Sequence, residues 1–107
     1  GETITDIRPE KIRRVITDTI SKKVTELLVA VVDSGSGKAA RIQGMKVAGK
    51  TGTSQQLVNG VYSKQNYNAS FVGFYPAEDP QVAVIVVVDR PKYSIYGGSN
   101  SAPIFKD

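Results

Sequence analysis

Two β-rich segments joined by a short turn set the strongest limit on how this chain can fold. Ala69–Tyr75 alternates between small and large residues, and Val82–Val88 is a continuous run of aliphatic, mostly β-branched residues. The link Pro76–Pro80 is far shorter than the dozen or so residues that a parallel crossover needs, so the two strands are expected to pair antiparallel. The unbroken apolar run also predicts a strand that is buried on both faces.

Ahead of these strands, Thr17–Asp33 carries apolar residues at the spacing of one helical face, namely Ile20, Val24, Leu27, Leu28 and Val31. Thr17 or Asp18 can cap the start of this helix, and the charge of Asp18 suits the positive end of the helix dipole. The segment Ser34–Gly37 ends the helix, and Gly35 is expected to take the left-handed cap conformation.

Shorter signals place the other elements. Val47–Gln55 contains glycines and threonines that disfavour a helix and predict a strand with close backbone approach. Asn59-Gly60 is typical of a two-residue hairpin turn. Arg90–Asn100 is expected to be a surface loop, and Ser101–Phe105 the start of a second helix capped by Ser101. The predicted fold class is α+β, an antiparallel sheet with helices packed against it.

Composition excludes several kinds of chemistry. The sequence has no cysteine and no histidine, which removes disulfides, thiolate nucleophiles, imidazole bases and Cys/His metal sites. We expect no metal and no cofactor. The net charge of +4 is mild and spread along the chain, so nucleic acid is not an expected partner. No apolar run approaches the length of a membrane helix.

One motif admits two interpretations. Gly44–Thr51 matches the phosphate-binding pattern Gly-x4-Gly-Lys-Thr, and Val82–Val88 followed by Asp89 could supply the strand and acid that hold magnesium. The context disfavours this nucleotide-binding interpretation. The segment before the motif, Lys38–Gln43, is half polar, and the residues after Thr51 lack helical periodicity.

The other interpretation takes Lys50–Thr53 as a motif carried on a strand. Thr51 and Thr53 are two residues apart, so both side chains point to one face, and strict alternation sends Lys50 to the other. Gly52 would allow a ligand to approach the backbone. Free N–H groups and hydroxyls at a strand edge suit a carboxylate or the oxyanion of an acyl transfer.

A longer set of motifs resembles one protein family. The matching stretches, in order, are Gly35–Ala40, Val47–Gln55, Ala69–Pro76, Val82–Lys92 and Tyr96–Phe105. Together they resemble the C-terminal part of the transpeptidase domain of class B penicillin-binding proteins, the monofunctional, high-molecular-mass enzymes that cross-link peptidoglycan. Asn100-Ser101 is a minor departure, since the family more often has two small apolar residues there. Residues 1–107 are thus expected to form a single partial domain with part of the penicillin-binding and β-lactamase-like fold.

The resemblance implies a role for each residue of the motif. Lys50 would supply positive charge that organises proton transfer and attracts the substrate carboxylate, and the hydroxyls of Thr51 and Thr53 would bind that carboxylate. The backbone N–H of Thr53 would be an oxyanion-hole donor, and Gly52 would leave room for the acyl group. The family's other motifs are missing: no serine is followed three residues later by lysine, and no Ser-x-Asn occurs. This chain therefore holds no nucleophile, and alone it is expected to be inactive.

The resemblance also implies partners and a location. They are the remainder of the transpeptidase domain, the peptidoglycan stem peptide and β-lactams, at the extracytoplasmic face of a bacterial membrane to which the parent protein is anchored. The chain itself shows no anchor, and exposed apolar surface would favour self-association. The alternative is a non-catalytic module that uses the sheet for binding or as a scaffold.

Overall fold

The computed structural model describes residues 5–107 of the chain. In order, the elements are α1 (Asp18–Ser34), a 3₁₀ turn η1 (Lys38–Ala40), β1 (Ala48–Val58), β2 (Val61–Tyr75), β3 (Val82–Asp89) and α2 (Gly97–Lys106). The three strands form one sheet in the order β1-β2-β3, and both neighbouring pairs are antiparallel. The predicted α+β class is confirmed, as are the antiparallel pairing across Pro76–Pro80 and the hairpin turn at Asn59-Gly60. None of the helices in this part of the chain is long and apolar enough to cross a membrane.

Helix α1 begins one residue later than the predicted segment and ends at Ser34. The side chain of Thr17 accepts a hydrogen bond from the backbone N–H of Ile20 at 3.2 Å, which makes Thr17 the N-cap. Gly35 follows the helix with φ −104° and ψ −152°, so the expected left-handed cap is wrong. The N–H groups of Gly35 and Gly37 both donate to the carbonyl of Val31 from extended and bridge-like backbone conformations instead.

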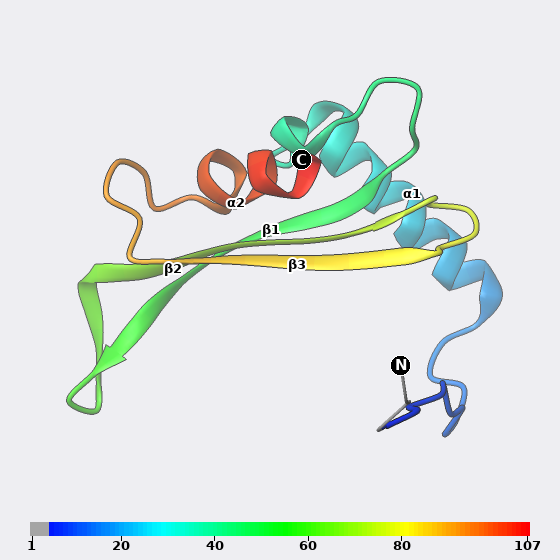
Figure 1. The fold of residues 1–107 in the computed structure, drawn as a ribbon, viewed down its shortest axis with the longest axis horizontal. Helices are drawn as coiled ribbons and strands as arrows, with labels where there is room; N and C mark the ends of the chain where they lie inside the picture. The colour runs from blue at the N-terminus through cyan, green and yellow to red at the C-terminus, as the bar shows by residue number, and fades with distance from the viewer. Residues whose placement is uncertain (1–4) are drawn as a thin grey trace.

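Two clusters of buried side chains join the helices to the sheet. In the first, Phe71 of β2 is fully buried with Val32 of α1 and Ala102 of α2. The second joins Val29 of α1 to Ala48 at the start of β1. As Figure 1 shows, α2 lies along one side of the sheet, and the distal part of the β1–β2 hairpin bends away from it. The contacts of α1 and α2 with β1 thus fix the strand that carries the candidate motif.

The burial predicted for Val82–Val88 is wrong in this chain. These residues form β3 at an edge of the sheet, where Ile85 and Val87 are 67% and 57% exposed. An unbroken aliphatic run indicates a strand suited to burial, and the described residues pack little against its outer edge. The sheet therefore presents an apolar strand with one unpaired edge.

Helix α2 begins at Gly97, four residues earlier than predicted, so the expected surface loop over Arg90–Asn100 is partly wrong. Ser101 is not a cap. It lies in the middle of α2, its side chain is fully buried, and its Oγ donates to the carbonyl of Ala69 on β2 at 2.8 Å. The helix can start at Gly97 because that residue has no side chain to separate it from the strands beneath.

Candidate active site

The motif Lys50–Thr53 lies in the middle of β1, which is the edge strand opposite β3. An edge strand leaves a row of backbone N–H and C=O groups without partners in the sheet. Lys50 and Thr53 are exposed, whereas Thr51 and Gly52 are half-buried. The structure thus brings all four sequence-predicted residues together beside a free strand edge, which is where a peptide or an acyl group could align.

The side chain of Lys50 bends back toward the motif. Lys50 pairs with Val72 of β2, and Thr51 pairs with the buried Phe71, so the two side chains leave on opposite faces as alternation predicts. The ammonium of Lys50 nevertheless donates to the carbonyl of Thr51 at 3.0 Å. This bend keeps the positive charge next to the threonines, where an anionic ligand can reach it.

Ser36, which follows α1, supports the motif from the other side. The hydroxyls of Ser36 and Thr51 lie 3.0 Å apart and share a hydrogen bond. Ser36 did not stand out from the sequence as a site residue, because its contact with Thr51 spans 15 positions and depends on how α1 docks against β1.

Glycines allow the start of α2 and strand β2 to lie close to the motif strand β1. A Cβ at Gly97 would lie 2.7 Å from the carbonyl oxygen of Gly52, and one at Gly98 would collide with the carbonyl of Ser36. At Gly52 itself a Cβ would meet the hydroxyl of Ser70 at 2.5 Å. The start of α2 is therefore pressed directly against the motif strand. The adjacent glycines at the start of α2 are the one sequence signal of this contact.

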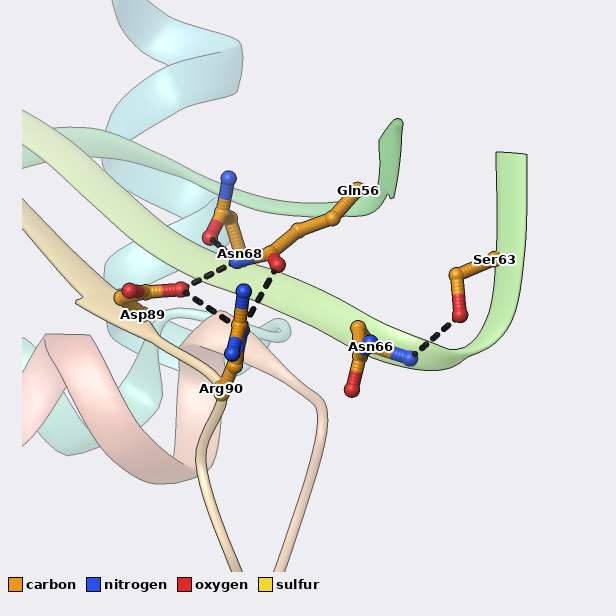
Figure 2. A network of polar contacts seen from close by, with 6 residues as sticks. All are labelled: Gln56, Ser63, Asn66, Asn68, Asp89 and Arg90. Atoms are coloured by element: carbon orange, nitrogen blue, oxygen red, sulfur yellow. Dashed lines mark hydrogen bonds and ion pairs between the residues drawn. The ribbon is translucent and has the colours of Figure 1, made fainter. Parts of the chain in front are cut away.

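A cluster of polar side chains ties the sheet together beyond the motif, as Figure 2 shows. The Nε2 of Gln56 donates to Asn68 Oδ1 at 2.7 Å and also to the carboxylate of Asp89. Its Oε1 accepts from Arg90 Nε at 2.9 Å. Residues of all three strands and the following loop thus meet around one carboxamide, which the sequence patterns do not reveal.

The structure contradicts the phosphate-loop alternative. Ala48–Thr51 is regular β-strand paired with β2, whereas a phosphate loop must leave a strand and open a helix. Asp89, the suggested magnesium ligand, is bonded to Gln56.

One charged pair borders the start of β1. Lys46 donates to Glu78 at 2.7 Å, and both side chains are exposed. This hydrogen bond and the nearby carboxylate charge raise the pKa of Lys46 above its ordinary value of 10.5. The pair connects the approach to β1 with the turn between β2 and β3.

Comparison with known proteins identifies the class to which this fold and edge strand belong. Residues 3–107 match the family described as the penicillin binding protein transpeptidase domain. Stage V sporulation protein D of Bacillus subtilis is 41% identical over 104 residues, covering 96% of this chain and 16% of that protein. The probable peptidoglycan D,D-transpeptidase PenA of Neisseria flavescens is 42% identical over 97 residues, covering 89% and 24% respectively.

Solved structures agree. The transpeptidase domain of penicillin-binding protein 3 from Burkholderia pseudomallei superposes with a TM-score of 0.77 at 35% identity, covering 97% of this chain and 32% of that one. The transpeptidase domain of FtsI4 from Legionella pneumophila gives 0.73 at 32% identity, with 85% and 34% covered. This chain belongs to the penicillin-binding protein transpeptidase family and corresponds to a C-terminal part of that domain. It spans only a minor part of each relative's length.

Proposed function

We propose that Lys50–Thr53 form the substrate-binding strand of a peptidoglycan D,D-transpeptidase that cross-links the cell wall by acyl transfer. One observation carries this proposal: a Lys-Thr-Gly-Thr sequence lies along a free sheet edge in a chain of the transpeptidase family. The ligands would be the peptidoglycan stem peptide and, as its mimics, β-lactams.

Each residue has a distinct proposed role. The ammonium of Lys50 attracts the substrate carboxylate and organises proton transfer. The hydroxyls of Thr51 and Thr53 bind that carboxylate by donating to it, and Thr51 can do so while it accepts the hydrogen bond that it shares with Ser36. The N–H of Thr53 stabilises the oxyanion, a contribution worth roughly 3 kcal/mol in other acyl-transfer enzymes.

Catalysis needs residues from elsewhere in the protein. The nucleophilic serine and the Ser-x-Asn motif have no counterpart in this sequence, so we propose that residues 1–107 form one partial domain completed by the remainder of the transpeptidase domain. The relatives are far longer than this chain, which supports that arrangement. The complete protein would work at the extracytoplasmic face of the membrane, where peptidoglycan is cross-linked.

Mass measurement after incubation with a labelled penicillin tests the proposal. The complete protein should gain one covalent adduct, and the isolated 107-residue chain should gain none because it lacks the nucleophile. A stoichiometric adduct on the isolated chain would contradict the proposal. Absence of an adduct on the complete protein would favour the alternative, a non-catalytic scaffold.

A further inference from the structure

The regular pairing of β1 with β2 stops two residues after Thr53. It runs without a break from Ala48↔Phe74 to Gln55↔Tyr67 and resumes only at Leu57↔Tyr62. Between these points the register of the two strands shifts and Gln56 has no partner residue on β2. On β2, the hydroxyl of Ser63 accepts hydrogen bonds from the backbone N–H groups of Gln65 and Asn66 in this irregular stretch. The backbone ladder alone therefore leaves the end of the motif strand weakly held.

The side chain of Gln56 supplies the missing connection. Its amide nitrogen donates to Asn68 and Asp89, and its carbonyl oxygen accepts from Arg90, so every polar atom of the carboxamide is engaged. The backbone N–H of Arg90 in turn donates to the backbone carbonyl of Tyr67 at 2.9 Å, which anchors the cluster to β2. Figure 2 shows these side chains converging from β1, β2 and the end of β3.

The two residues to which Gln56 donates lie in the row of cross-strand partners next to that of Thr53, the proposed oxyanion donor. Ser54, Asn68 and Asp89 are opposite one another across the three strands, and the row before them begins with Thr53. We propose that Gln56 is a positioning residue, which holds the end of β1 on the sheet and thereby fixes the Thr53 N–H for acyl transfer. The catalytic part of this inference rests on the proposed function.

The directions of the hydrogen bonds at Gln56 require a side chain that both donates and accepts. Gln56 donates toward Asn68 and Asp89 while it accepts from Arg90. At this position a protonated glutamate could make one of the two donations, and an ionised glutamate could make neither. An ionised glutamate at this position would face the carboxylate of Asp89 with no proton to offer. Exchanging the amide and the acid between positions 56 and 89 would restore a donor and an acceptor.

The test uses the complete protein with the variants Q56E and Q56E/D89N. Q65E is the matched control, because Gln65 is exposed on the same hairpin and its side chain makes no hydrogen bond in the described structure. Amide hydrogen exchange over residues 53–58 and the acylation rate with penicillin are measured at pH 8 and at about pH 4.5, near the ordinary pKa of glutamate. Each variant is compared with the wild type at the same pH.

At pH 8, Q56E should exchange about tenfold faster over residues 53–58 and acylate about tenfold more slowly. Protonation near pH 4.5 should return both quantities toward wild-type values, and Q56E/D89N should recover them at pH 8. The inference is overturned if Q56E matches Q65E at both pH values, or if the double variant is no better than Q56E. Should Q56E fail to fold, wild-type exchange in Q56E/D89N supports the tether and fast exchange there overturns it.

The exchange data separate this inference from the proposed function. If the wild type is never acylated, the proposed function fails. Rescue of exchange by the double variant would then still support Gln56 as the tether of β1, and only its catalytic consequence would be lost. If the wild type is acylated and Gln56 variants change exchange but not acylation, the positioning role is refuted.

Discussion

Substituting Gly97 by alanine should weaken the contact between α2 and the motif strand. The added Cβ would lie 2.7 Å from the carbonyl oxygen of Gly52 and closer still to that of Ser70. These two residues are partners across β1 and β2, so the clash falls on the centre of the proposed site. Relief of the closer contact, with the carbonyl oxygen of Ser70, requires α2 to move outward by about 1.5 Å, since unstrained contacts lie near 3.5 Å.

The expected cost follows from overpacking. Inserting a methyl group into a closed contact costs about 1–3 kcal/mol, and the gain in helix propensity from glycine to alanine returns at most about 1 kcal/mol in a helix interior. Gly97 is the first residue of α2, so the gain there is smaller. We therefore expect a net loss of about 1–2 kcal/mol in the free energy of unfolding.

Urea denaturation of the complete protein measures this loss, with Ser99→Ala as the control. Ser99 is exposed in the first turn of α2, so its replacement should change stability by less than about 0.5 kcal/mol. The acylation rate should fall in Gly97→Ala and stay unchanged in the control. Wild-type stability and acylation in Gly97→Ala would refute the close packing of α2 on β1.

Three further predictions concern other parts of the chain. Ser101→Ala should lower the free energy of unfolding by about 1–3 kcal/mol, because the carbonyl of Ala69 loses a buried donor; urea denaturation checks it, and an unchanged midpoint would count against the buried bond. The stabilisation that Lys46 gains from Glu78 should be complete below pH 10.5 and disappear as the pH rises through the raised pKa of Lys46. The stability difference between wild type and Glu78→Gln should therefore vanish at the alkaline end of a pH series, and a difference that persists there would contradict this assignment. The isolated chain should self-associate through the open edge of β3, so light scattering should show oligomers, and a clean monomer over a wide concentration range would argue against it.

Local patterns in the sequence predict most of the elements, because helix periodicity, turn residues and strand propensity are local properties. Helix α1, strand β3 and the turn between β2 and β3 follow from such signals within a residue or two, whereas β2 begins at Val61, well before the predicted Ala69. The two main errors arise from tertiary contacts. The apolar run of β3 indicates suitability for burial but cannot reveal what covers it, and Gly97-Gly98 resembles a loop until α2 is seen against the carbonyls of β1 and β2.

The candidate site divides in the same way. A strand-borne Lys50–Thr53 could be predicted, since the glycine and threonines exclude a helix and the alternation places the threonines on one face. The residues that support this strand, Ser36 and Gln56, could not be predicted from the sequence. Ser36 and Gln56 contact partners that are 15 and 33 positions away in the sequence, and contacts between such distant positions depend on how whole elements dock.

The most direct test of the proposed site is whether Thr53 recognises a substrate carboxylate. Acylation rates of the complete protein are measured with a penicillin and with its methyl ester, for the wild type, Thr53→Val and the neighbouring control Ser54→Ala. Loss of a hydrogen bond to a charged group costs about 1.5–3 kcal/mol, so Thr53→Val should slow the free acid roughly 10- to 100-fold and leave the ester nearly unchanged. Equal slowing of both compounds, or no slowing of either, would contradict a carboxylate-binding role for this strand.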